Sequence, residues 1–196
     1  HRPPRHQPSH PWQSLSPFPS HRLEAACRLV SDGPPVLAIG PTANWRAKTW
    51  RSDHFAELIG RLTGPGGILP GCRVAIFGRD DERPMALRLI EEIPAESCID
   101  LVGKLDLLTV YACLARCNFY VGNDSGLMHV SAALETKTVA MFGSTTDEFT
   151  PPLSSNSQTL SRTLDCRPCF KRVCPLGHLD CLRKITPKAV ITVLGV

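Results

Sequence analysis

The sequence predicts an α/β fold built on a doubly wound parallel sheet. Five short apolar runs carry this prediction, at residues 36–40, 73–78, 98–102, 118–122 and 138–143. They do not alternate with polar residues, which is typical of strands buried on both faces. Segments with helical periodicity separate the runs, and a repeated strand–helix–strand order favours right-handed crossovers between parallel strands.

The helical segments place apolar residues at the i, i+3, i+4 and i+7 positions of an amphipathic helix. The pattern occurs at residues 55–62, 86–93, 107–114 and 127–134. Ser52 is expected to cap the first of these helices, and Pro84 suits the first position of the second. A short helix is expected over residues 22–31, and a last one from Thr186 and Pro187.

Length and composition predict one globular domain. With 196 residues, 42% of them hydrophobic, the chain can bury a core, and no apolar run approaches the roughly 18–20 residues of a membrane span. Residues 1–22 hold six prolines, so we expect a disordered tail or a cloning remnant there and the domain at residues 23–196. Outside the tail, 19 basic residues face 18 acidic ones, a balance that does not indicate a general nucleic-acid or membrane binder.

Two of the predicted strands run into polar segments at their carboxyl ends, the edge of an open parallel sheet where ligands bind. The first is Pro-Thr-Ala-Asn-Trp-Arg-Ala-Lys at residues 41–48, and the second is Asn-Asp-Ser-Gly at residues 123–126. A helix that starts at Ser125 offers unpaired backbone N–H groups, which suit a phosphate. The alternative is that Asp124 or Ser125 only caps this helix and that His129 is structural.

Charged residues at neighbouring strand ends extend this candidate site. Lys48 could pair with the same phosphates as a point charge, although a solvated loop lysine is the more common case. Asp80, Asp81 and Glu82 follow the second strand, where a carboxylate can accept a hydrogen bond from a ribose hydroxyl. Three adjacent acids could equally form a solvated turn.

Together these segments resemble the carboxyl-terminal domain of the ADP-heptose:lipopolysaccharide heptosyltransferases of glycosyltransferase family 9. N-F-Y-V-G-N-D-S-G-L-M-H-V-S-A-A-L at residues 118–134 is similar to the segment that marks the wider family. F-T-P-P-L-S at residues 149–154, followed by C-R-P-C-F-K-R-V-C-P-L-G-H-L-D-C at residues 166–181, resembles the heptosyltransferase II branch. The resemblance covers roughly residues 35–194 and departs from the family at residues 135–137, where Glu-Thr-Lys replaces a turn that usually carries glycine.

The resemblance implies one half of a GT-B glycosyltransferase, in which two Rossmann-like domains face each other across a cleft. The carboxyl-terminal domain holds the donor, here ADP-heptose, and the amino-terminal domain holds the lipopolysaccharide-core acceptor and the catalytic aspartate. Residues 23–196 are therefore expected to be the donor domain of an inverting transferase, with the acceptor domain absent and this chain inactive by itself. The resemblance also implies a cytoplasmic protein at the inner face of the bacterial inner membrane, with peripheral membrane contact, no nucleic-acid partner and no required cofactor.

Site residues follow from the resemblance, position by position. Lys48 matches a lysine that meets the donor phosphates and neutralises charge on the leaving diphosphate, which makes it the catalytic residue expected in this chain. Leu105 matches an apolar residue that packs on adenine. The ribose-binding acid is expected among Asp80, Asp81 and Glu82, which the resemblance does not align uniquely. The expected substrate-binding residues are Thr42, Asn44, Lys48, Asp81, Leu105, Asp124, Ser125, Gly126 and His129.

The nine cysteines form two groups. Five lie among apolar residues and are expected to be small core residues. These are Cys27, Cys72, Cys98, Cys113 and Cys117. The other four surround His178 and include a Cys-x2-Cys pair typical of structural Zn²⁺ sites. These are Cys166, Cys169, Cys174 and Cys181. With no secretory signal in view, free thiols or Zn²⁺ are expected rather than a disulfide framework, although burial or disulfides formed in air would also account for the cluster.

A second function class stays open on the residues alone. The cysteine cluster could belong to a zinc-stabilised nucleotide- or nucleic-acid-binding module without transferase activity, whose affinity would fall steeply with salt. The chain does not interleave aromatic and basic residues as base-stacking surfaces do, which counts against this alternative. Six basic residues against two acidic ones between Arg162 and Lys184 could face acceptor phosphates or lipid headgroups, or form a solvated surface.

Overall fold

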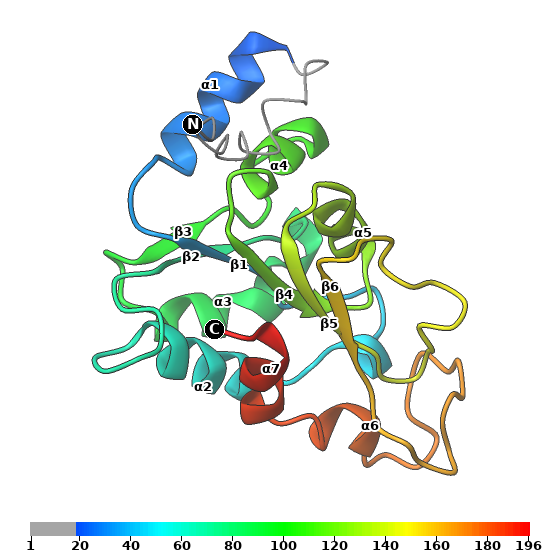
Figure 1. Ribbon diagram of the computed structural model, residues 1–196. Coiled ribbons are helices and arrows are strands. Elements are labelled where there is room, and N and C mark those ends of the chain that lie inside the picture. Colours follow the sequence, from blue (N-terminus) through cyan, green and yellow to red (C-terminus); the bar gives the residue numbers. More distant parts are fainter. Residues whose placement is uncertain (1–18) are drawn as a thin grey trace, which may run out of the picture.

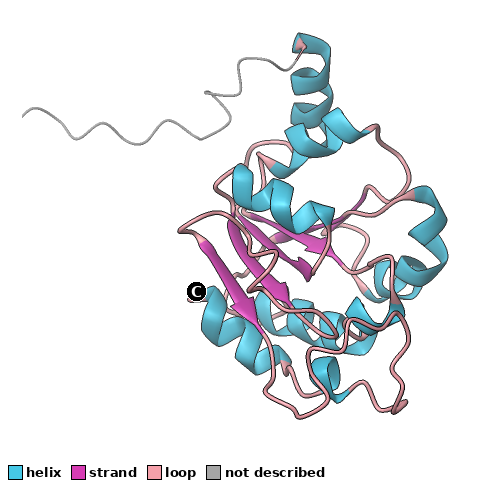
Figure 2. Ribbon diagram, turned by 90° about the vertical axis from the view of Figure 1, so that its right-hand side faces the viewer, coloured by secondary structure: helices cyan, strands magenta, loops and turns pink. Residues whose placement is uncertain are grey.

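The computed structural model describes residues 19–196, and its centre is a six-stranded sheet between two layers of helices (Figure 1, Figure 2). All neighbouring strands pair in parallel, in the order β3-β2-β1-β4-β5-β6. The strands are β1 (Val36–Gly40), β2 (Arg73–Ile76), β3 (Cys98–Asp100), β4 (Phe119–Asn123), β5 (Lys137–Met141) and β6 (Ser157–Leu160). This arrangement confirms the predicted fold class.

The long helices divide between the two faces of the sheet (Figure 1). One face is covered by α2 (Ser52–Thr63), α3 (Arg83–Glu92) and α7 (Pro187–Leu194). The other is covered by α1 (Ser20–Leu29), α4 (Leu107–Leu114) and α5 (Gly126–Ala133). Shorter elements are α6 (Asp180–Arg183) and the 3₁₀ turns η2 (Arg46–Lys48) and η3 (Asp80–Glu82). Within residues 19–196, no helix combines the length and the apolar composition that crossing a bilayer requires.

Alternation along β1 shows how both layers form. Leu37 and Ile39 belong to the core cluster shared with α2, α3 and α7, whereas Val36 and Ala38 belong to the cluster shared with α1, α4 and α5. Successive strand residues point to opposite faces of a sheet. Because helices cover both faces here, every residue of β1 is buried, and the strand is a continuous apolar run in the sequence.

The apolar pattern did not predict β6. Its sequence, Ser-Gln-Thr-Leu, is mostly polar, and it pairs with β5 at the edge of the sheet, where Ser157 aligns with Thr138 and Leu160 with Met141. Its residues are half-buried or exposed. Backbone pairing therefore holds this strand in place, and it carries little of the apolar signal that marks the central strands.

Helix starts agree with the sequence patterns except at one cap and one boundary. Thr186 caps α7 by accepting a hydrogen bond from Ala189 N at 3.3 Å. In α2, however, Arg51 occupies the N-cap and Ser52 is the first helical residue, so the capping role predicted for Ser52 is wrong. α1 begins at Ser20, and the boundary expected at residue 22 falls inside this helix. The rest of the expected tail, residues 1–18, lies outside the described residues.

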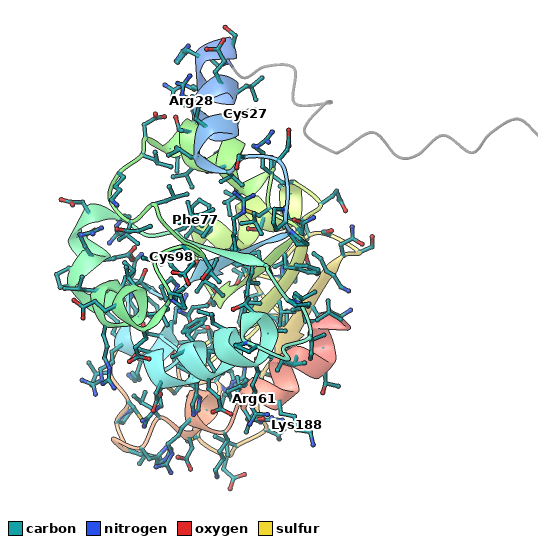
Figure 3. All side chains as sticks on the ribbon, turned by 90° about the vertical axis from the view of Figure 1, so that its left-hand side faces the viewer. Cys27, Arg28, Arg61, Phe77, Cys98 and Lys188 are labelled. Carbon is teal, nitrogen blue, oxygen red and sulfur yellow. The ribbon has the colours of Figure 1, made fainter. Side chains whose placement is uncertain are left out.

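The scattered cysteines are not all in the core. Cys72, Cys113 and Cys117 are buried, and burial raises the pKa of each thiol. Cys98 is half-buried, whereas Cys27 is exposed on α1 at one end of the molecule (Figure 3). The core role predicted for Cys27 is wrong because α1 packs with Ala26 toward the sheet and turns Cys27 toward solvent.

Candidate functional site

The carboxyl ends of the central strands open into a cleft of about 810 Å³. The cleft lies where the strand order reverses, between β1 and β4, which is the place where open α/β sheets bind ligands. Its walls come from the loops after β1, β2, β3 and β4 and from parts of α4 and α5. Eight of the nine predicted substrate-binding residues line it, namely Thr42, Asn44, Lys48, Leu105, Asp124, Ser125, Gly126 and His129.

Lys48 and Asp124 form an ion pair inside the cleft. Lys48 Nζ lies 2.7 Å from Asp124 Oδ2, and the two side chains are 19% and 5% exposed. Thr145 Oγ1 donates a hydrogen bond to the same carboxylate oxygen at 2.6 Å. The ammonium also lies 4.6 Å from the centroid of the Trp45 ring, a cation–π distance. These contacts hold the positive charge of Lys48 at a defined point of the cleft.

Asn123, the last residue of β4, ties the loop after β1 into place. Its fully buried side chain donates from Nδ2 to the carbonyl oxygens of Gly40 at 3.3 Å and Thr42 at 3.4 Å, and accepts from Trp50 N at 2.8 Å. Lys48 lies on that loop, so Asn123 positions it indirectly. We did not predict Asn123 as a site residue, although an amide at the end of an apolar strand is a signal that could have found it.

Two glycines at the strand ends make room for Tyr120 beneath the cleft. A Cβ atom at Gly40 or Gly122 would lie 2.3 Å from the Tyr120 hydroxyl oxygen. Burial raises the pKa of Tyr120, and the neighbouring Ser125 side chain lowers it by a smaller amount. The hydroxyl therefore stays protonated under the floor of the cleft, next to the start of α5.

The start of α5 faces the cleft without a side-chain cap. Ser125 is the N-cap in extended conformation and makes no capping hydrogen bond with its side chain, and the Asp124 carboxylate is engaged by Lys48 and Thr145. The alternative that either residue serves only as a cap is therefore not supported. No described atom lies within 4 Å of a Cβ placed on Gly126, so an anion can approach the first backbone N–H groups of the helix.

The acidic turn after β2 directs its three acids differently. Asp81 does not line the cleft. Its side chain is 69% exposed and pairs with Arg79 at 2.8 Å, and this hydrogen-bonded contact lowers the pKa of Asp81. Asp80 and Glu82 do line the cleft. Glu82 is buried and accepts a hydrogen bond from Arg79 N at 2.9 Å, which fixes its carboxylate in place. The 3₁₀ turn η3 separates the directions of the three acids. The sequence allowed a turn at these residues but did not show which of them faces the cleft.

Apolar side chains form a wall in one part of the cleft. Leu105, which follows β3, lines the cleft together with Leu107 and Val110 of α4. Gly103 permits the turn that leads to this wall, because it has φ +70° and a Cβ there would lie 2.7 Å from the Asp80 Cα. Apolar side chains in the same cleft as a carboxylate and a cationic group suit a nucleotide, with its base, ribose and phosphates.

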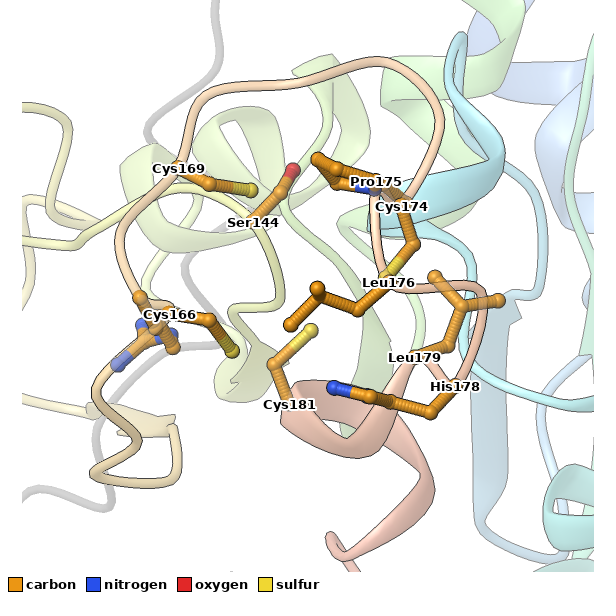
Figure 4. A pocket seen from close by; sticks show the side chains of 11 residues that line it. Ser144, Cys166, Cys169, Cys174, Pro175, Leu176, His178, Leu179 and Cys181 are labelled. Carbon is orange, nitrogen blue, oxygen red and sulfur yellow. The ribbon is translucent and has the colours of Figure 1, made fainter.

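The clustered cysteines lie around a separate cavity of about 50 Å³, which Cys166, Cys169, Cys174 and Cys181 line together with His178 (Figure 4). In the described part of the chain, no group of three or more His, Cys, Asp or Glu side chains is placed closely enough to hold a metal ion. The Zn²⁺ site stays a prediction, with the shared cavity as the observation in its favour.

The family model of glycosyltransferase family 9 (heptosyltransferase) matches residues 8–180 of the chain, a range that begins inside the expected tail. Lipooligosaccharide heptosyltransferase 2 of Campylobacter jejuni is 32% identical over 83% of this chain and 51% of its own length. Lipopolysaccharide heptosyltransferase 2 of Escherichia coli K12 is 31% identical over 85% of this chain and 47% of its own length.

A solved structure, that of E. coli ADP-heptose lipopolysaccharide heptosyltransferase II, superposes with a TM-score of 0.73 at 29% identity, covering 90% of this chain and 51% of that one. The chain therefore spans about half the length of the curated relatives named above. Because the family model matches most of the chain, and relatives and fold agree with it, the chain belongs to glycosyltransferase family 9, the heptosyltransferase family.

Proposed function

We propose that the cleft binds ADP-heptose as the donor for inverting transfer of heptose to the inner core of lipopolysaccharide. The observation that carries the proposal is the Lys48–Asp124 pair, which lines the same cleft as the uncapped start of α5. A lysine and a helix start in one cleft suit a diphosphate. The names of the family 9 relatives supply the donor and the acceptor.

The cleft offers a place for each part of the donor. The diphosphate would lie against the start of α5 at Ser125 and Gly126, within reach of Lys48. The adenine would pack on Leu105, and the ribose hydroxyls would donate to Glu82, whose position is fixed by its contact with Arg79 N. A preorganised acceptor of this kind costs little reorganisation when the ligand binds.

The chemical step is a single displacement at the anomeric carbon of the heptose. An acceptor hydroxyl oxygen forms the new bond, the bond from that carbon to the diphosphate oxygen breaks, and ADP leaves with the electron pair. Lys48 and the N–H groups of α5 would stabilise the negative charge that develops on the diphosphate. The hydroxyl proton would pass to a carboxylate base.

We assign that base to the acceptor side of the enzyme. Asp124 is engaged by Lys48 and Thr145, and Glu82 is assigned to the ribose hydroxyls. The chain by itself is therefore proposed to bind the donor without transferring heptose.

The charges of the cleft do not favour the alternative, a nucleic-acid-binding module. Among its described lining residues, Lys48 and Arg79 are basic, whereas Asp80, Glu82 and Asp124 are acidic. Nucleic-acid grooves are strongly basic, because they neutralise a row of phosphates. A single diphosphate needs far less positive charge.

We further propose that the protein acts at the cytoplasmic face of the inner membrane and contacts it peripherally through one surface patch. The patch comprises exposed apolar and basic residues of two neighbouring loops, Phe149, Leu153, Phe170, Lys171, Arg172, Val173 and Leu176. The rings of Phe149 and Phe170 lie 6.0 Å apart, which joins the loops. Arg172 also lies over Trp45 of the cleft, at 5.5 Å. Apolar side chains between cations suit an anionic bilayer, where a lipid-linked acceptor would lie beside the donor.

Titration of the chain with ADP-heptose, followed by calorimetry, tests the donor assignment. Lys48→Ala should weaken binding about tenfold or more, because it removes a charge-assisted contact to phosphate. Lys188→Ala is the matched control, since Lys188 is exposed on α7 outside the cleft. Equal affinity of the Lys48→Ala variant and the unmodified chain would contradict the proposal.

A further inference from the structure

The segment between β6 and α6, residues 161–179, has neither helix nor strand, and none of its residues is fully buried. Irregular loops of more than about 12–15 residues are uncommon in compact domains. Stretches without an apolar core of their own usually depend on disulfides or metals for a fixed structure. A segment of this kind is a candidate for a stabilising cross-link.

Hydrogen bonds attach the segment to the donor cleft. Cys169 N and Phe170 N both donate to the carbonyl oxygen of Ser144, at 3.1 and 2.8 Å, and Ala47 N donates to the carbonyl oxygen of Arg172 at 3.2 Å. Ala47 precedes Lys48, and Ser144 precedes the threonine that binds Asp124. Any cross-link in the segment would thus support the backbone on both sides of the Lys48–Asp124 pair.

Four thiols converge on one cavity at the base of this segment. Cys166, Cys169 and Cys174 come from the segment and Cys181 from α6, and their sulfurs are directed into the same space of about 50 Å³ (Figure 4). Cys181 is buried, and Cys169 and Cys174 are half-buried. Thiolates crowded around one space would repel one another, and a divalent cation among them would convert this repulsion into attraction.

A tight turn at residues 175–179 follows Cys174. Gly177 N donates a hydrogen bond to the Cys174 carbonyl oxygen at 3.1 Å and closes the turn. Gly177 and Leu179 have φ +73° and +53°, which curl the backbone around the sulfur. The thiolate is the form of cysteine that binds metal ions.

His178 lines the cavity but is occupied at one ring nitrogen. Its Nδ1 accepts a hydrogen bond from Asp180 N at 2.9 Å, which leaves the proton of the neutral ring on Nε2. A protonated nitrogen can donate to a thiolate but cannot bind a metal. The four cysteines are therefore the candidate ligand set, and the Nε2–H of His178 remains available to donate a hydrogen bond.

We propose that Cys166, Cys169, Cys174 and Cys181 form a tetrathiolate site for one Zn²⁺ or Fe²⁺ ion, which fixes residues 161–179 against the donor cleft. Binding forms four metal–sulfur bonds and releases the four thiol protons to solvent. Tetrahedral tetrathiolate sites select these two ions. The four side chains must draw together from their present positions to reach bonding distance, since they do not yet form a tight ligand group.

Elemental analysis of the chain, purified under reducing conditions without chelator, tests the site. One metal ion per chain is expected, and the element that the analysis finds distinguishes iron from zinc. Cys174→Ser should lower metal content at least about tenfold, since it removes one of the four proposed ligands. Cys27→Ser, at an exposed thiol of α1 outside the cluster, should retain the full content.

A second measurement avoids variants that fail to fold. The metal-free, reduced chain is titrated with Co²⁺, and a tetrathiolate site gives intense tetrahedral ligand-field bands that saturate at one ion per chain. Absence of these bands together with absence of bound metal overturns the proposal. Mass spectrometry of the chain kept under reducing conditions gives a further check. Disulfides among the four cysteines in that sample would also overturn the proposal. Neither readout depends on donor binding, so the site can fail while the proposed function stands.

Discussion

Lys48 Nζ and Asp124 Oδ2 lie 2.7 Å apart, although the residues come from different strand ends and are 76 positions apart in the sequence. β1 and β4 are neighbours only because the strand order reverses between them. The pair thus lies at the switch point of the sheet, and the contact restricts the side-chain conformation of both residues.

The ion pair predicts a coupled effect on stability. Lys48→Met leaves the Asp124 carboxylate buried without its cation and should lower the free energy of unfolding by about 1–3 kcal/mol. Adding Asp124→Asn should restore most of this loss, because the amide can still accept from Thr145. Urea unfolding of both single variants and the double variant measures the coupling. Simple additivity of the two changes would show that the pair does not interact.

The acidic turn predicts opposite behaviour of two adjacent residues. Glu82→Gln should weaken ADP binding about tenfold, because it removes a fixed carboxylate acceptor from the ribose side of the cleft. Asp81→Asn should leave ADP affinity unchanged, since Asp81 points to solvent and pairs with Arg79. Calorimetric titration of both variants decides between the two acids. A loss confined to Asp81→Asn would reverse the assignment.

The close approach of Tyr120 to Gly122 predicts that a larger residue at position 122 destabilises the fold. Gly122→Ala places a Cβ 2.3 Å from the Tyr120 hydroxyl oxygen, and overpacking of this kind costs about 1–3 kcal/mol. Gly126→Ala, whose Cβ would meet no described atom within 4 Å, is the matched control and should unfold like the unmodified chain. Thermal and urea unfolding measure both. Equal stability of the two variants would mean that Tyr120 moves away at no cost.

The left-handed backbone of Glu135, in the turn after α5, predicts that two substitutions at this position differ in stability. Glu135 has φ +57°, a left-handed conformation in which residues with a Cβ are strained by about 1–2 kcal/mol. Glu135→Gly and Glu135→Ala both remove the 2.9 Å contact with Ser154, but only glycine relieves the backbone. The glycine variant should therefore be more stable than the alanine variant by about 1 kcal/mol. Equal free energies of unfolding would argue against a left-handed Glu135.

The proposed membrane patch predicts selective vesicle binding. The chain should co-sediment with phosphatidylglycerol vesicles more than with phosphatidylcholine vesicles, and less at high salt. Leu153→Ser and Val173→Ser together should reduce binding, because both side chains are exposed within the patch. Ile68→Ser, at an exposed apolar residue between α2 and β2, is the control. If all variants bind as the unmodified chain does, another surface makes the contact.

The central fold could be predicted because β1 to β5 and the long helices leave strong apolar periods in the sequence. β6 could not, since an edge strand of Ser-Gln-Thr-Leu is held by backbone pairing. Cys27 was misassigned for a related reason. Apolar neighbours in the sequence indicate a helix, but which of its faces packs inward depends on where that helix meets the sheet.

The candidate site could be predicted in outline because strand ends with polar residues converge at one edge of a parallel sheet. Its finer assignments depended on local geometry. Whether Asp81 or Glu82 faces the cleft depends on the 3₁₀ turn η3. The role of Asn123 depends on hydrogen bonds to a distant loop, such as that to Thr42, 81 residues earlier in the chain. The sequence allows a turn at the three acids and shows an amide at the end of an apolar run, but it does not show which acid faces the cleft or which carbonyls the amide reaches.

Calorimetric titration of the folded chain with ADP, in parallel with UDP and GDP, tests the central claim most directly. The cleft is proposed to bind the diphosphate through Lys48 and α5 and the base through the wall at Leu105. ADP should therefore bind at one site, at least about tenfold more tightly than UDP or GDP. Equal affinities for the three nucleotides, or no binding by a chain that unfolds cooperatively, would contradict a donor site in this cleft.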